Sequence, residues 1–287
     1  MAATIKTVEN RRMCPNCRAF ITTKDRVCPY CGVQLGPRAI DLRAAQLAGS
    51  LVPQANQTSI ILLIINAAFF LAELATNYRF SGAFPGSGLT YQTLVLFGAK
   101  SAPLIHAGQW WRLITAGFLH ASFVHIAMNS WALFVLVREV EQFYGTSRLI
   151  VAYIVSTFTG FLLSLLWSPA ISLGASAACY GLIGIMLAMG LRRHDPLAKA
   201  VRSYYGQWVI FGLVLSILPG VDIAAHVGGL AGGFIIGLVG GLPGHPNSAR
   251  EMLWKTLAAV SIGITLYAFW QDFLSYRFLL RHVFTNT

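Results

Sequence analysis

The chain has 287 residues, of which 56% are hydrophobic and only 11% are charged. A soluble domain usually carries about 25% charged residues, so the mean hydropathy of +0.62 points to a lipid bilayer as solvent rather than to an ordinary soluble domain. The net charge of +11 would suit a nucleic-acid partner, but the placement of the basic residues, described below, argues against nucleic-acid binding.

Residues 1–36 form a small polar unit built around four cysteines. Residues 14–17 read CPNC and residues 28–31 read CPYC, with ten residues between the pairs. Two such turns can present four thiolates to a tetrahedral zinc ion, and Gly32 suits a tight turn after the second pair. Two disulfides or a redox pair are alternatives that a reducing cytosol disfavours, and an iron site of the rubredoxin type is another. The sequence predicts a structural zinc ribbon, with the ligands Cys14, Cys17, Cys28 and Cys31.

The role of this ribbon stays open at the sequence level. It would hold a cytosolic protein partner, regulate the rest of the chain, or cap the N-terminus. The fifth cysteine, Cys179, stands alone in an apolar stretch and is interpreted as a core residue rather than a reactive thiol.

Residues 37–57 read as a linker, and seven apolar runs follow it. Each run is close to the roughly 20 residues that a membrane-spanning helix needs. They cover residues 58–76, 117–137, 149–168, 174–191, 204–219, 222–241 and 253–271. The sequence therefore predicts an all-α polytopic membrane protein. We expect no signal peptide, because the first 57 residues are mostly polar.

A long segment, residues 77–116, separates the first two predicted helices. It contains several glycines and prolines, among them Pro85 and Gly86, and the amphipathic stretch WWRLITAGF. Loops of this length are often functional, so we expect this one to be structured and to take part in function.

The distribution of Lys and Arg predicts the orientation in the membrane. With the N-terminus in the cytosol, the inner segments hold 16 of the 21 basic residues. The predicted C-terminus then lies outside, and the basic excess is mainly a topology signal, helped by anionic lipid on the inner leaflet.

Polar groups inside a membrane are costly and often mark function, and here they gather at one depth. The second helix carries His120, His125 and Asn129, the fourth carries Ser176 and Tyr180, and the sixth carries His226. All three helices start on the outer face and carry these groups near that start. A single buried histidine or serine is often only a packing or hydrogen-bonding residue, but their coincidence favours a reaction site.

A serine hydroxyl needs a base within hydrogen-bond reach, and His226 is the natural base because imidazole titrates near neutrality. Asp222 lies one turn above His226 near the interface, so a Ser–His dyad is favoured over a triad. Small residues allow the two helices to pack closely. These are Gly174, Gly181 and Gly184 on the fourth helix and Gly228, Gly229, Gly232 and Gly233 on the sixth.

The second helix would supply the oxyanion site. His125 and Asn129 are four residues apart and so share a helix face, and their donors, with the backbone N–H of Ser176, could bind a developing negative charge. One such donor is typically worth about 2.7–4 kcal/mol of barrier. His120 lies off that face and is predicted to be a structural hydrogen-bonding residue.

Three stretches together make the chain resemble the rhomboid family of intramembrane serine proteases. They are GQWWRLITAGFLHASFVHIAMN, GASAACYG and AHVGGLAGG, in that order. The resemblance covers residues 58–241 and implies a six-helix core. Residues 242–271 would add a cytosolic loop and a seventh helix, and residues 272–287 a C-terminal tail.

Carried over by position, the resemblance implies that Ser176 is the nucleophile and His226 the general base. It also implies that His125 and Asn129 are the oxyanion residues and that Tyr180 packs on the catalytic histidine. Further supporting positions are Gly174, Trp111 and Arg112, the last two in the first loop. Ala177 departs from the family pattern, which has glycine after the serine, and its extra methyl group could strain the turn or narrow the site.

The resulting hypothesis is an intramembrane serine protease that needs no catalytic cofactor. It would cleave transmembrane proteins in or near their membrane-spanning segments, within a bilayer that the pattern suggests is a prokaryotic inner membrane. The alternatives are a catalytically inactive relative that binds membrane clients, a transporter or channel, and a structural membrane anchor. A transporter is disfavoured because Glu73 is the only carboxylate well inside an apolar run away from the site.

Overall fold

The computed structural model describes residues 11–14, 16–22, 25–35, 57–82, 88–192, 196–217, 219–245 and 248–282. It divides into two compact units, Met1–Ala55 and Asn56–Thr287. Residues 37–56 of the predicted linker lie outside the described residues, as do Pro85, Gly86 and the last five residues of the chain.

The N-terminal unit is a small β structure around the cysteines. Strand β1 (Arg11–Met13) pairs antiparallel with β2 (Phe20–Thr22), with Met13 opposite Phe20. A second antiparallel bridge joins Val27 and Gln34. Its buried residues are Cys14, Ile21 and Cys28, with Val33 and Leu35 packed against them. A core of this size rarely stabilises a small unit by itself, so a bound metal ion would add stability to the fold.

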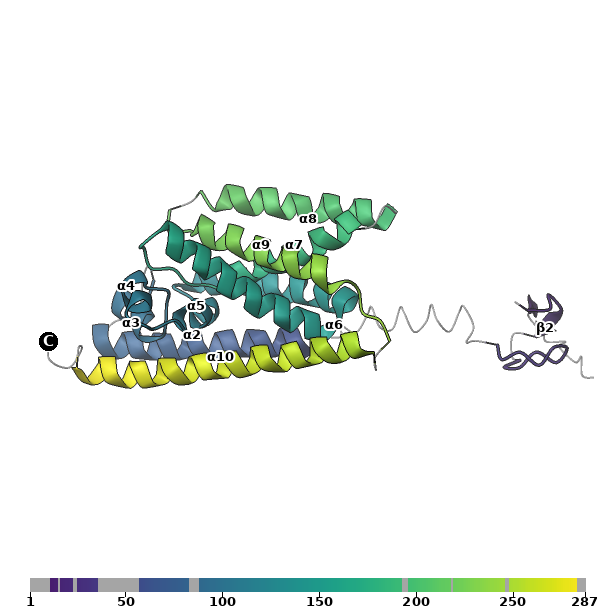
Figure 1. Ribbon diagram of the computed structural model, residues 1–287, viewed down its shortest axis with the longest axis horizontal. Coiled ribbons are helices and arrows are strands. Elements are labelled where there is room, and N and C mark those ends of the chain that lie inside the picture. The colour runs from purple at the N-terminus through teal and green to yellow at the C-terminus, as the bar shows by residue number, and fades with distance from the viewer. Residues whose placement is uncertain are drawn as a thin grey trace, which may run out of the picture. The chain divides into compact units, whose positions relative to one another are not determined.

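The second unit is helical (Figure 1). Its long helices are α2 (Gln57–Ser81), α6 (Phe123–Trp167), α7 (Ser176–Arg192), α8 (Pro196–Leu215), α9 (Ile223–Gly240) and α10 (Ala249–His282). Its short ones are α3 (Tyr91–Leu96), α4 (Ala102–His106), α5 (Arg112–Thr115) and the 3-10 helix η1 (Ala116–Phe118). Four helices of the described part, α2, α6, α9 and α10, are long and apolar enough to cross a membrane, and α7 is a shorter apolar helix. The predicted all-α polytopic membrane fold is confirmed.

Helix α6 accounts for two of the predicted helices. It spans 45 residues, or about 68 Å at 1.5 Å per residue, which is far more than a hydrocarbon core of about 30 Å requires. Gly145 interrupts it with φ 74° and ψ 163°, outside the helical region. The chain therefore reverses at this glycine, and the two arms on either side correspond to the second and third apolar runs.

Several helix boundaries differ from the sequence prediction for local reasons. The first arm of α6 begins at Phe123 rather than at 117, because Ser122 caps it by accepting a hydrogen bond from the His125 N–H. Helix α8 begins at Pro196 rather than at 204, since proline is favoured in a first turn. Helix α10 runs to His282, so most of the predicted tail is helical, with Leu279 still buried.

Helices α7 and α9 lie together in the middle of the helical unit, next to α6 (Figure 1). Their backbones touch at glycines. A Cβ atom built on Gly233 would lie 1.9 Å from the carbonyl oxygen of Gly181, and one on Gly229 would lie 2.1 Å from that of Ala177. No side chain fits in such gaps, so the close approach of these two helices requires glycine, as the sequence predicts.

Residues 88–122 form a structured loop at one end of the helical unit (Figure 1). Lys100 is fully buried there, and its Nζ donates to the backbone carbonyls of Ser164, Ser168 and Ala170. Arg112 is equally buried and donates through Nη1 to the carbonyls of Val95 and Ala99. Lys100 thus ties the loop to the end of α6, and Arg112 ties parts of the loop to one another, which agrees with the expected structured loop.

Helix α10 runs beside α2, on the face of the unit opposite α8 (Figure 1). Phe269 stacks on Phe69 of α2 with centroids 4.6 Å apart and also meets Phe118 of η1. At the other end of α10, Glu251 accepts two hydrogen bonds of 2.7 Å from Arg148 of α6. The seventh helix is therefore packed onto both the loop and the core.

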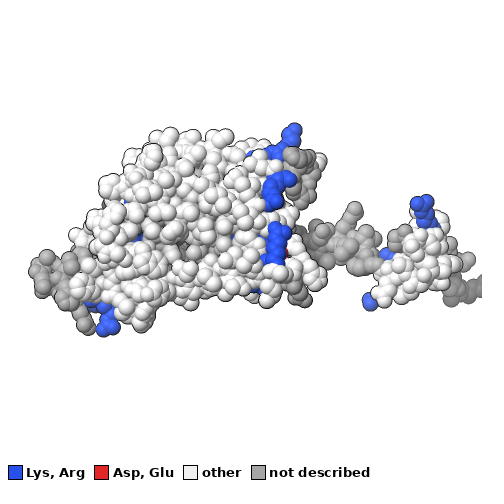
Figure 2. All heavy atoms as spheres, in the orientation of Figure 1, with Lys and Arg blue, Asp and Glu red and all other residues white. Residues whose placement is uncertain are grey.

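Basic side chains gather at the end of the helical unit away from this loop (Figure 2). That end holds the Gly145 turn, the end of α7 with Arg192 and the starts of α8 and α10 with Lys199 and Arg250. The clustering supports the predicted orientation with this end in the cytosol, which stays a prediction.

Candidate active site

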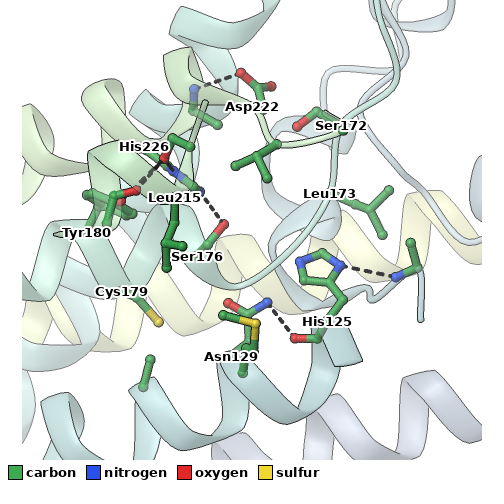
Figure 3. Close-up of a pocket in the computed structure, with 18 of the residues that line it drawn as sticks. His125, Asn129, Ser172, Leu173, Ser176, Cys179, Tyr180, Leu215, Asp222 and His226 are labelled. Atoms are coloured by element: carbon green, nitrogen blue, oxygen red, sulfur yellow. Dashed lines mark hydrogen bonds between the residues drawn. The ribbon is translucent and has the colours of Figure 1, made fainter. Parts of the chain in front are cut away.

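Ser176 and His226 meet at the loop end of helices α7 and α9. Ser176 is the first residue of α7, and His226 lies in the first turn of α9. The Oγ atom of Ser176 and the Nε2 atom of His226 are 2.9 Å apart (Figure 3). The structure thus brings together the two residues that the sequence singled out, at the distance that general-base activation of a serine requires.

Gly174 shapes the turn before Ser176. Its φ is +127°, a region that favours glycine, and its N–H donates 2.9 Å to the carbonyl of Ala116 in η1. A Cβ atom at position 174 would lie 2.7 Å from Nε2 of His125. The absence of a side chain therefore allows the His125 ring to approach the serine turn.

Asp222 organises the start of α9 without touching the imidazole. Its Oδ1 accepts a hydrogen bond of 3.0 Å from the N–H of Ala225 (Figure 3). Its Oδ2 accepts one from the hydroxyl of Ser164. The carboxylate thus caps the helix and ties it to α6. This geometry agrees with a dyad that lacks a carboxylate partner.

Two side chains pack against His226 on the side away from Ser176. The ring of Tyr180 stacks on the imidazole, with centroids 4.2 Å apart and planes 15° apart. The Oγ of Ser216, just after the end of α8, lies 2.6 Å from Nδ1 of His226. Sequence reasoning missed Ser216, because one serine in an apolar helix resembles many packing serines and its ten-residue distance from His226 has no helical meaning.

His125 and Asn129 face the serine from α6 (Figure 3). The Nδ1 of His125 accepts a hydrogen bond of 3.3 Å from the Ala121 N–H, so Nε2 carries the proton of the neutral ring. That Nε2 is the atom close to Gly174. One amide proton of Asn129 is donated to the His125 carbonyl at 3.1 Å, which leaves the other for a ligand.

The remaining predicted residues lie behind the site. His120 is fully buried before the start of α6, and its ring packs edge-on against His125 at 5.2 Å. Its backbone N–H donates to Glu73, and its role as a structural hydrogen-bonding residue stays a prediction. Trp111 and Arg112 sit in the loop and do not contact the Ser–His pair.

Ala177 directs its methyl group away from the reacting atoms. A Cβ atom built on Gly160 of α6 would lie 2.8 Å from the Cβ of Ala177. The methyl group of Ala177 therefore fills space that Gly160 leaves open, and it is fully buried there. The structure gives no sign that it narrows the space around Ser176.

The site opens into a pocket of about 1150 Å³ between α6 and α8. Met128 and Trp131 line it from α6, and Trp208 and Phe211 line it from α8. Ser176, His226, His125 and Asn129 lie on its wall. An apolar pocket with a few convergent polar groups is the usual form of a binding site.

The four cysteines of the N-terminal unit form a second candidate site. Their Sγ atoms all lie within 4.8 Å of one another, and the pairs Cys14–Cys31 and Cys17–Cys28 are each 3.7 Å apart. Tetrahedral zinc with Zn–S bonds near ~2.3 Å places sulfurs about 3.8 Å apart, whereas a disulfide needs about 2.05 Å. The four sulfurs could hold a metal ion, and their spacing fits one better than the alternative of two disulfides.

The backbone repeats itself around the two cysteine pairs. The N–H groups of Cys14 and Cys28 donate to Ala19 and Val33, and their carbonyls accept from Arg18 and Gly32. Arg18 has φ 61° and Gly32 has φ +70°. A non-glycine residue rarely adopts such a φ, but Arg18 does so in the turn that matches the one at Gly32. The two cysteine turns therefore share one backbone conformation and one hydrogen-bond pattern.

Comparison with known proteins bears on the helical unit. Residues 107–242 match the Rhomboid domain, and this segment contains all the polar residues of the pocket wall described above. The comparisons support the assignment of this segment to the rhomboid family. The four cysteines of the N-terminal unit lie outside the matched residues.

Several relatives are named rhomboid proteases or rhomboid-like proteins. The chain is 33% identical over 184 residues to the rhomboid protease GluP of Bacillus subtilis, an alignment that covers 63% of the chain and 36% of the relative. It is 35% identical over 180 residues to RHOMBOID-like protein 1 of Arabidopsis thaliana, covering 61% and 46%. It is 32% identical over 132 residues to the putative rhomboid protease YdcA of Bacillus subtilis, covering 45% and 66%. The chain thus spans between about a third and two thirds of these relatives.

The cysteine site predicts a bound metal in the purified protein. We expect about one equivalent of zinc by elemental analysis, because four sulfurs at this spacing satisfy a tetrahedral ion. Replacing both Cys14 and Cys28 with serine should remove that zinc. The Cys179→Ser variant is the control and should keep it. Wild-type protein that carries iron, or no metal after purification without chelator, would contradict the zinc assignment.

The contact of Ala177 with Gly160 predicts a coupled pair. Gly160→Ala should lower the melting temperature in detergent by several degrees, since overpacking usually costs about 1–3 kcal/mol. Ala177→Gly in the same chain should restore part of that loss. Gly206→Ala, within α8 and with no atom within 4 Å, is the matched control and should not lower the melting temperature, because alanine is the better helix former. Simple additivity of the two substitutions would contradict this packing.

Proposed function

We propose that the chain is an intramembrane serine protease of the rhomboid type, in which Ser176 and His226 form the catalytic dyad. The observation that carries the proposal is the 2.9 Å contact between Ser176 Oγ and His226 Nε2 at the wall of an apolar pocket. The names of the relatives support a protease at the level of the family.

In the first step, Ser176 Oγ attacks the carbonyl carbon of a peptide bond while its proton passes to His226 Nε2. The carbonyl oxygen becomes an oxyanion. Its partners would be the Nε2–H of His125, the free amide proton of Asn129 and the backbone N–H of Ser176, which opens α7 and so has no partner within the helix. Such donors act strongly in a site from which water is excluded.

In the second step, the imidazolium of His226 gives its proton to the leaving amine, and the peptide bond breaks. The acyl group stays on Ser176 as an ester. A water molecule then attacks that ester, gives its proton to His226 Nε2 and releases the carboxylic acid, and the proton returns to Ser176 Oγ. The side chains described here carry the whole cycle without a cofactor.

The proposed substrates are transmembrane proteins that present an extended segment to the pocket. The site lies at the loop end of α7 and α9, a few residues from the helix starts. We place this end at the outer face of the membrane and the basic end in the cytosol, together with the N-terminal ribbon. The ribbon's proposed zinc would be structural, because four cysteine ligands leave no open coordination position. A cytosolic protein partner of the ribbon stays a proposal.

The proposal predicts that cleavage of a membrane reporter depends on the dyad. The reporter joins a secreted domain to a single membrane span with glycines near its outer end, and fragments are measured by immunoblot. Ser176→Ala and His226→Ala should abolish cleavage, and Asn129→Ala should slow it by about 10²-fold, the usual cost of one oxyanion donor. Thr265→Val, on α10 away from the site, should cleave normally.

Undiminished cleavage by the Ser176→Ala variant would contradict the mechanism. A wild-type protein that binds the reporter in the membrane but leaves it intact would instead support the client-binding alternative. Each variant is compared at equal abundance in the membrane, so that loss of folding is distinguished from loss of chemistry.

A further inference from the structure

Ser216 is the second polar neighbour of the His226 ring. It follows the last residue of α8 and is buried, with 5% of its surface exposed. Its Oγ lies 2.6 Å from His226 Nδ1, 2.8 Å from the carbonyl oxygen of Gly212 and 3.4 Å from the hydroxyl of Tyr180. The imidazole is therefore held between two serines, one at each ring nitrogen.

The directions of these hydrogen bonds follow from the available protons. The carbonyl of Gly212 can only accept, so the single proton of the Ser216 hydroxyl is donated to it. The lone pairs of Ser216 Oγ then face His226, and Nδ1 must supply the proton of that bond. A neutral imidazole carries one proton, so Nε2 is left unprotonated and able to accept the proton of Ser176.

We propose that Ser216 is a positioning residue that holds His226 in the Nδ1–H form, with Nε2 free to act as the base. The proposal rests on the proposed function of the Ser176–His226 pair. Ser216 thus takes the orienting place that a carboxylate fills in a serine triad, through a neutral hydroxyl.

The other groups around the ring cannot take this place. The carboxylate of Asp222 accepts from the Ala225 N–H and the Ser164 hydroxyl, and among the described residues it makes no hydrogen bond to the imidazole. Tyr180 meets the ring face to face at 4.2 Å, a contact that fixes the plane of the ring but not which nitrogen carries the proton. Among the described residues, Ser216 is the one whose side chain contacts Nδ1, so the tautomer depends on it.

This arrangement also makes the base depend on helix α8. Ser176 and His226 belong to α7 and α9, whose backbones touch at glycines, whereas Ser216 directly follows α8. A Cβ atom on Gly212 would lie 2.2 Å from the Tyr180 hydroxyl, so α8 is seated directly on α7 at this level. Ser216 can therefore hold the imidazole only while α8 packs on α7 at the level of Tyr180.

The first test is kinetic. Ser216→Ala should lower kcat for reporter cleavage by about 10-fold or more, with KM little changed, because the hydrogen bond serves the base and not substrate binding. Ser216→Thr keeps the hydroxyl and should restore most of the rate. Thr157→Val is the matched control, because it removes a buried hydroxyl that donates to the carbonyl four residues earlier but does not contact His226.

The second test reads the tautomer directly. Nitrogen NMR of histidine-labelled protein in lipid, with His226→Ala to assign the signal, should show Nδ1 protonated and Nε2 unprotonated in the wild type. In Ser216→Ala the Nε2–H form should gain population, while Thr157→Val should leave the spectrum unchanged. Ser216→Cys replaces Ser216→Ala if the latter folds poorly, since a thiol keeps the size but is a weak acceptor.

An unchanged tautomer in Ser216→Ala would overturn the proposal even if the rate falls, because the role of Ser216 would then be structural. A changed tautomer at an unchanged kcat would also overturn it. If the wild type cleaves no reporter, the proposed function fails, but the NMR result still decides whether Ser216 sets the tautomer.

Discussion

The contact between the backbones of α7 and α9 is the constraint on which the site depends. Ser176 and His226 stand near the starts of these helices, 50 positions apart in the chain, and they meet only because glycines allow the helices to touch. Gly181 and Gly233 pack backbone to backbone, so closely that a methyl group on Gly233 would have no room. Since lipid offers no hydrophobic drive for helix association, such close packing supplies the attraction that holds the two helices together.

Around this contact, each neighbour fixes one property of the proposed dyad. The turn at Gly174 is tied to η1 through the carbonyl of Ala116, so the loop that contains Arg112 also fixes the serine. Asp222 caps α9 and fastens it to α6. Polar groups that are buried without partners are expensive, and here most of those near the dyad are paired, which keeps the reacting atoms in one geometry.

Much of the fold and of the candidate site could be predicted from the sequence, because each depends on a local signal. Apolar runs of spanning length marked the helices, and the spacing of His125 and Asn129 placed both on one face. Boundaries depended on caps and tertiary contacts, as at Ser122 and at the end of α10. Ser216 could not be found, since its partner is reached only through the packing of α8 on α7. The effect of Ala177 likewise depended on Gly160, a residue of another helix.

The central claim is that His226 activates Ser176 for nucleophilic attack. The most direct test is to treat the purified protein in lipid with a fluorophosphonate and to locate the adduct by peptide mass spectrometry. Activation predicts one adduct, on Ser176, and no adduct there in the His226→Ala variant, because an unactivated serine is a weak nucleophile. A folded wild-type protein without an adduct at Ser176, or an equal adduct in the His226→Ala variant, would contradict the claim.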